Sequence, residues 1–132
     1  MKIEDHSRNI KESIEVINES ITKGIEERQR NIGFNTSVAA TEMLEVFLHK
    51  LNLIHPGLAL KHDLFSSITS ANEKLSFDFP HKKEIIELIH EIESKKNLLC
   101  YGKPQPVKTM ELVISSFNRL KEILKKEGLS WD

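Results

Sequence analysis

The chain has 132 residues, of which 39% are hydrophobic and 30% are charged, and its formal net charge is −1 at pH 7. This length and composition are typical of one globular domain and exclude an intrinsically disordered chain. A net charge near zero also excludes a global attraction to the phosphate backbone of nucleic acids, so any such site has to be local. We therefore expect a single domain over residues 1–132.

The only cysteine, Cys100, excludes an intramolecular disulfide and is typical of a protein in a reducing compartment. The N-terminal residues are polar and lack an apolar signal region, and no run of about 18 apolar residues is present. These features predict a cytoplasmic protein with no membrane segment.

The first half of the chain predicts two helices. Ile10, Ile14, Ile17, Ile21 and Ile25 alternate in steps of four and three, which is one face of a helix. This helix is expected to begin at Asp5 or Ser7 and to stop at Gly33. A second helix is expected to begin near residues 35–37, which are good capping types, and to end before Pro56.

The second half predicts a less regular helical region over residues 58–75, then a loop that buries Phe77 and Phe79. A further helix follows Pro80 and reaches about Leu99, and the last one runs from Pro106 to Gly128. Helices joined by short connections pack as antiparallel neighbours. The sequence therefore predicts an all-α, up-and-down bundle of four to five helices.

Two pairs of residues have the spacing of metal ligands. Glu87 and His90 show the spacing found in carboxylate-bridged two-iron bundles, but such sites need the motif twice. Glu45 and His49 are four residues apart, which suits two ligands and equally a hydrogen-bonded surface pair. Because both glutamates flank the apolar stripes of their helices, we expect no bound metal.

No glycine-rich phosphate loop is present, so no nucleotide cofactor is expected. A nucleophilic role for Cys100 would need a histidine base that the sequence does not place beside it. A lone cysteine beside Leu98 and Leu99 is typical of a small buried hydrophobic residue.

The end of the penultimate helix combines positive charge with an aromatic residue. These features fit a local anion or RNA contact, but they are more often found at a solvated, capped helix end. The candidate ligand-binding residues are Lys95, Lys96, Asn97, Tyr101, Lys103 and Lys108.

At this segment the chain resembles the HEPN family, small helical proteins named for a nucleotide-binding domain shared by higher eukaryotes and prokaryotes. The resemblance covers the helical layout over residues 5–126 and the turn Tyr101-Gly102 at the end of the penultimate helix. In the family's ribonucleases this helix carries an arginine and, just before the tyrosine, a histidine that moves protons. Here Lys95 or Lys96 stands in place of the arginine, and Cys100 in place of the histidine.

A thiol does not replace an imidazole as general acid and base, and lysine lacks the bidentate contact of arginine. The resemblance therefore implies a non-catalytic binding or partner domain. The alternative is a residual or altered ribonuclease, whose candidate catalytic residues would be Lys96, Cys100 and Tyr101. The resemblance also implies a homodimer and a small nucleotidyltransferase as partner, with RNA or a nucleotide as ligand.

Overall fold

The structure is a computed structural model that describes residues 1–131. Within these residues all regular secondary structure is helical, with five α-helices and one short 3₁₀ helix, η1. In chain order the elements are α1 (Ile3–Lys23), α2 (Gln29–Lys50), η1 (His62–Phe65), α3 (Ile68–Lys74), α4 (Lys82–Tyr101) and α5 (Val107–Lys126).

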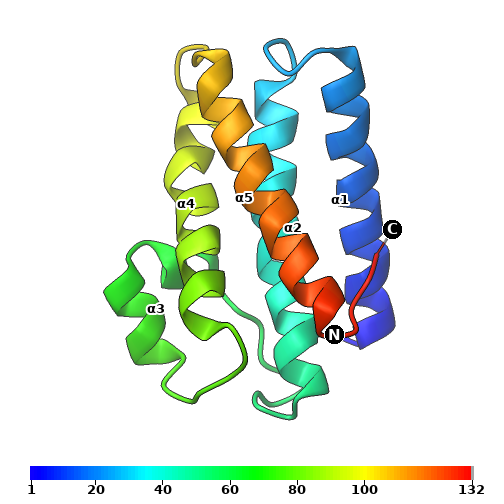
Figure 1. The fold of residues 1–132 in the computed structure, drawn as a ribbon, viewed down its shortest axis with the longest axis vertical. Helices are drawn as coiled ribbons and strands as arrows, with labels where there is room; N and C mark the ends of the chain where they lie inside the picture. Colours follow the sequence, from blue (N-terminus) through cyan, green and yellow to red (C-terminus); the bar gives the residue numbers. More distant parts are fainter. Residues whose placement is uncertain (132) are drawn as a thin grey trace.

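The four long helices α1, α2, α4 and α5 run alternately up and down (Figure 1). Helix α2 lies at the centre and packs against α1, α4 and α5, whereas η1 and α3 pack beside α4. The predicted all-α, up-and-down bundle is therefore confirmed. We call the end that carries the α1–α2 turn (residues 24–28) and the α4–α5 loop (residues 102–106) the turn end.

The predicted boundary between the first two helices is wrong. Helix α1 ends at Lys23, because Gly24 adopts φ 130°, which side-chain-bearing residues rarely adopt. Ile25 prolongs the apolar stripe of α1 in the sequence, yet it lies in the turn. Helix α2 then begins at Gln29 and continues through Gly33.

The residues expected to cap the second helix lie inside it instead. Thr36 and Ser37 are both fully buried. The Thr36 hydroxyl donates to the carbonyl of Ile32, one turn earlier in the same helix. Ser37 contacts side chains from η1 and α4. Their polar groups therefore have partners within the core, which is why a buried helix tolerates them.

Gly33 is required by helix packing. A Cβ atom at Gly33 would lie 2.7 Å from the Cβ of Leu99 on α4, and 3.4 Å from the Sγ of Cys100. Carbon atoms do not approach so closely, and the Leu99 Cβ is fixed to its backbone. Glycine at this position therefore allows α2 and α4 to pack in direct contact near the turn end.

The later predictions agree with the structure, except that only one of the two phenylalanines expected to be buried in the loop is fully buried. The region 58–75 contains η1 and α3, and residues 75–79 form a loop in which Phe79 is buried and Phe77 half-buried. The last two helices, α4 and α5, lie within a few residues of their predicted bounds. No helix within residues 1–131 combines the length and apolar character needed to cross a membrane.

After α5 the chain crosses to α1, as Figure 1 shows. Leu129 and Trp131 are buried, and the indole Nε1 of Trp131 donates to the hydroxyl of Ser7 over 3.4 Å. This contact links the segment after α5 to the first helix.

The substitution Gly33→Ala is expected to lower the free energy of unfolding by about 1 kcal/mol. Alanine favours the helix by about 1 kcal/mol, but overpacking against Leu99 costs about 1–3 kcal/mol. Urea denaturation followed by circular dichroism measures the difference.

Gly57→Ala is the matched control, because a Cβ at Gly57 meets its nearest neighbour at an ordinary 3.5 Å. This variant should be as stable as the parent. If Gly33→Ala were equally stable, α2 and α4 would not be in such close contact.

Candidate functional site

The predicted ligand-binding residues all lie near the turn end, in the last turns of α4, the loop that follows and the first turn of α5. Tyr101 is the last residue of α4 and is 77% exposed. Asn97 and Lys103 are also exposed, and Lys96 is half-buried. Tyr101 therefore presents an exposed aromatic ring at the same end of α4 that carries Lys96 and Asn97.

Two of the lysines differ from the expected arrangement. The ammonium group of Lys95 lies 3.6 Å from the carboxylate of Glu91 on the same helix, so its charge is partly neutralised. Lys108 lies in the first turn of α5, so it does not complement the C-terminal dipole of α4. Lys108 instead adds positive charge at a helix N-terminus.

The structure adds Arg30 of α2, which could not be identified from the sequence. The carbonyl of Arg30 lies 3.9 Å from the Sγ of Cys100, and the charges of Arg30 and Lys96 both act on that thiol. Phe34, one turn after Arg30, is 52% exposed. We call Arg30, Phe34, Lys96 and Tyr101 the Arg30 surface.

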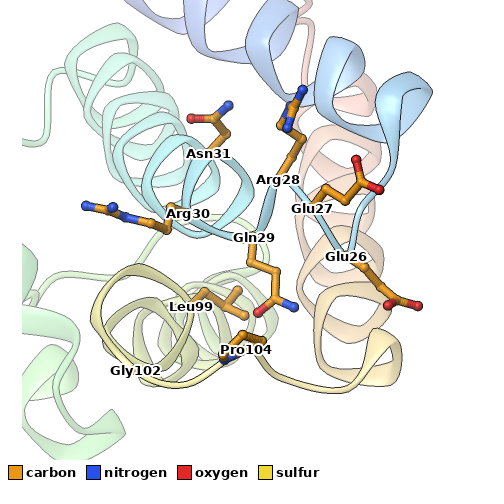
Figure 2. Close-up of a pocket in the computed structure, with 9 residues that line it drawn as sticks. All are labelled: Glu26, Glu27, Arg28, Gln29, Arg30, Asn31, Leu99, Gly102 and Pro104. Carbon is orange, nitrogen blue, oxygen red and sulfur yellow. The ribbon is translucent and has the colours of Figure 1, made fainter.

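A pocket of about 480 Å³ lies next to this surface, between the α1–α2 turn and the α4–α5 loop (Figure 2). Gln29 is directed toward Pro104, and its side chain exchanges two hydrogen bonds with the backbone of Gln105, of 2.8 and 2.9 Å. These bonds hold the loop against the start of α2.

The charges around the pocket are mixed. Figure 2 shows the guanidinium groups of Arg28 and Arg30 pointing in different directions, and Glu26 and Glu27 lie on the side of the α1–α2 turn. The two arginines therefore do not form one clamp for an anion. On the α4 side, the charges of Arg30 and Lys96 act on Cys100, and the carboxylate of Glu93 opposes them.

Cys100 is 8% exposed and packs against Gly33. Burial raises the pKa of its thiol, although Lys96 and Arg30 favour the thiolate. The thiol is therefore protonated near neutral pH and is a poor nucleophile or base there.

A partly buried polar network lies farther along α2. Nδ1 of His62 on η1 is 2.7 Å from Oε1 of Glu93 on α4 and 3.2 Å from the hydroxyl of Ser37, which donates to Glu93. Burial disfavours the charged form of Glu93, but the hydrogen bonds from His62 and Ser37 outweigh it and lower its pKa. This network ties η1 to both helices.

The same three residue types occur in serine hydrolases, but the geometry here differs. A catalytic triad needs the serine on one imidazole nitrogen and the acid on the other. Here Ser37 and Glu93 both face Nδ1 of His62, and Ser37 is fully buried. We therefore assign a structural role to this network.

The second polar cluster contains His6 of α1 with Glu45 and His49 of α2. One ligand atom from each of the three lies within 4.8 Å of the others. The prediction that Glu45 flanks the apolar stripe is wrong, because Glu45 is only 4% exposed. By contrast, Glu87 is exposed, and Nδ1 of His90 lies 2.9 Å from the carbonyl of Phe65.

Comparison with protein-family models, with curated proteins and with solved structures gives no match for the chain. The fold defines an antiparallel all-α bundle, and a function has to be inferred from the chain's own residues.

The network around Glu93 predicts a pH dependence of stability. Because folding lowers the pKa of Glu93 below its ordinary value of 4.5, its stabilising contribution is present above pH 4.5. That contribution is lost as the pH falls through the folded-state pKa. The parent should therefore be more stable than Glu93→Gln at neutral pH, and this advantage should shrink below pH 4.5.

Urea denaturation at a series of pH values measures this difference. Glu91→Gln is the matched control, since Glu91 forms a surface pair on the same helix. It should change stability little at any pH. An advantage of the parent over Glu93→Gln that stayed constant across the acidic range would contradict the assignment.

Proposed function

We propose that this chain is a non-catalytic, HEPN-like domain of the cytoplasm that binds single-stranded RNA through the Arg30 surface. The observation that carries the proposal is that Arg30 of α2 and Lys96 of α4 both act electrostatically on Cys100, the residue before the exposed Tyr101. RNA-binding surfaces for single strands combine basic groups for the phosphates with aromatic rings on which bases stack. Both kinds of group are present on this surface.

The exposure of the aromatic residues supports this function. Tyr101 is 77% exposed and Phe34 is 52% exposed, so neither ring is needed to fill the core. Exposed aromatic residues beside cations are better suited to stacking on bases than to a solvated helix end. Asn97 and Lys103 extend the same end of α4 with polar and basic groups.

The state of Cys100 favours binding over catalysis. A general acid and base needs a pKa near neutral and access to the substrate. Burial raises the pKa of Cys100, which takes it farther from neutral pH, and the thiol packs between α2 and α4. The ribonuclease alternative therefore receives no support from this position.

The double variant Arg30→Glu, Lys96→Glu tests the surface. Fluorescence anisotropy with a labelled single-stranded RNA of mixed sequence should show weaker binding. If each cation neutralises one phosphate, the plot of log affinity against log salt should become less steep, its negative slope being smaller in magnitude by about 1.4. The control Arg8→Glu, Lys11→Glu makes the same charge change on the exposed face of α1 and should bind as the parent does.

Variants at Tyr101 distinguish base stacking on the tyrosine ring from cleavage of the RNA. Tyr101→Ala should weaken binding by about 5- to 150-fold, the equivalent of 1–3 kcal/mol for one stacked base. Tyr101→Phe keeps the ring and should bind normally, and the RNA should stay intact. Cleavage by the parent that is lost in Tyr101→Phe would instead establish a ribonuclease.

Unchanged RNA binding in the Arg30→Glu, Lys96→Glu variant would overturn the proposed surface. No RNA binding by the parent would overturn the function itself. In that case, binding of a nucleotide or of a nucleotidyltransferase encoded by a neighbouring gene would identify the alternative ligand.

The proposal includes a homodimer that forms through the groove between α1 and α5. A pocket of about 580 Å³ there is lined in part by Ile21, Ile25 and Ile114, and Ile21 is 42% exposed. Exposed apolar side chains along a groove are typical of an interaction site.

Light scattering coupled to gel filtration at micromolar concentration is expected to give the mass of a dimer. Ile21→Glu should shift the protein to a monomer, because it places a charge in the proposed interface. Leu58→Glu, at a 49% exposed position in a loop, should leave the dimer unchanged. A monomer mass for the parent protein would reject dimerisation.

A further inference from the structure

The cluster of His6, Glu45 and His49 contains polar atoms that the protein does not satisfy. Within residues 1–131, the buried side-chain atoms without a hydrogen bond are Oε2 of Glu45 and Nε2 of His49. Nε2 of His6 lies 3.2 Å from Oε2 of Glu45, but the two are not aligned for a hydrogen bond. Native proteins rarely leave such atoms unpaired, because each costs free energy.

We propose that His6, Glu45 and His49 bind one zinc ion. Two imidazole nitrogens and one carboxylate are ligands that zinc prefers, and three protein ligands leave a fourth tetrahedral position open. Zinc bonds of 2.0–2.1 Å place neighbouring ligand atoms about 3.3 Å apart. His6 and Glu45 already have nearly this separation, and a small movement of His49 completes the set.

Groups around His6 and Glu45 orient these two side chains as a metal site requires. The second nitrogen of His6, Nδ1, lies 3.2 Å from the carboxylate of Glu42. The backbone N–H of Leu60 donates to Oε1 of Glu45 over 2.7 Å, which leaves Oε2 free. Metal-ligating histidines commonly donate their other N–H to a carboxylate or a backbone carbonyl.

A pocket lies beside the cluster. His49 lines a pocket of about 570 Å³ together with residues of α1 and of the loop after α2, among them Ile3, Leu53 and His55. The ion itself would join α1 to α2 at the end of the bundle opposite the turn end (Figure 1).

The competing explanation is an ion pair between His6 and the two glutamates without metal. That pair accounts for His6 and Glu42, but it leaves Nε2 of His49 and Oε2 of Glu45 without a hydrogen bond. A zinc ion gives both atoms a partner at once. The two explanations also differ in what added zinc does to the protein.

Calorimetric titration of tag-free, metal-stripped protein with zinc tests the site. We expect one ion per chain and a rise in the melting temperature, because zinc binds the folded state. Cobalt in the same site should give the strong visible absorption of a tetrahedral centre. Glu45→Gln should reduce zinc affinity at least about 100-fold, and Glu42→Gln, which alters only the group behind His6, about 10- to 100-fold.

Glu45→Gln keeps an oxygen for the Leu60 N–H, so its fold can be checked by circular dichroism before the titration. His49→Gln provides a second ligand variant if Glu45→Gln fails to fold. His81→Asn is the control, since it removes a histidine that lies outside the cluster, and asparagine tolerates its φ of 61°. No binding by the parent at micromolar zinc, or equal binding by parent and ligand variants, would leave only the ion pair and overturn the proposal.

Discussion

The contact between α2 and α4 at Gly33 is the constraint on which the arrangement of the polar residues depends. The absence of a side chain at Gly33 lets the two helices approach until Leu99 and Cys100 lie against the α2 backbone. The same approach places Arg30 beside the end of α4 and brings Glu93 within reach of Ser37. A larger residue at position 33 would push α2 and α4 apart and would break both contacts at once, because a close-packed interior transmits strain.

Helix α2 contributes polar residues to three regions: the turn end, the polar network around His62 and the polar cluster around His6. Gln29 holds the α4–α5 loop, Ser37 contacts His62, and Glu45 lies under the start of α1. The helix is buried on most of its surface, because α1, α4 and α5 all pack against it. Its polar side chains therefore need partners on other elements, and these partners fix the relative positions of the helices.

Much of the fold could be predicted from the sequence, because α1, α4 and α5 each have one apolar face and a charged opposite face. The end of α1 at Gly24 could not be predicted. Ile25 continues the apolar spacing of the helix, and Gly33 is as good a signal for a helix C-terminus as Gly24. The burial of Ser37 and Glu45 could not be predicted either. In a helix covered on most sides, polar residues no longer mark the solvent face.

The candidate sites were predictable only where their residues are neighbours in the sequence. Lys95, Lys96 and Tyr101 lie in one segment of the sequence, so their spacing along the chain is enough to predict them as one group. Arg30 comes from another helix, and its position beside Cys100 follows from the α2–α4 contact alone. His6 likewise meets Glu45 through tertiary packing, which no spacing along the chain reveals.

The contact between Trp131 and Ser7 has a practical consequence. Trp131 is the single tryptophan of the chain, and its buried indole rests on the residue that follows His6. The intrinsic fluorescence of the protein therefore reports, without any label, whether α1 is docked on the bundle. Local loosening of the first helix becomes visible as a change of emission even while the helical content measured by circular dichroism stays the same.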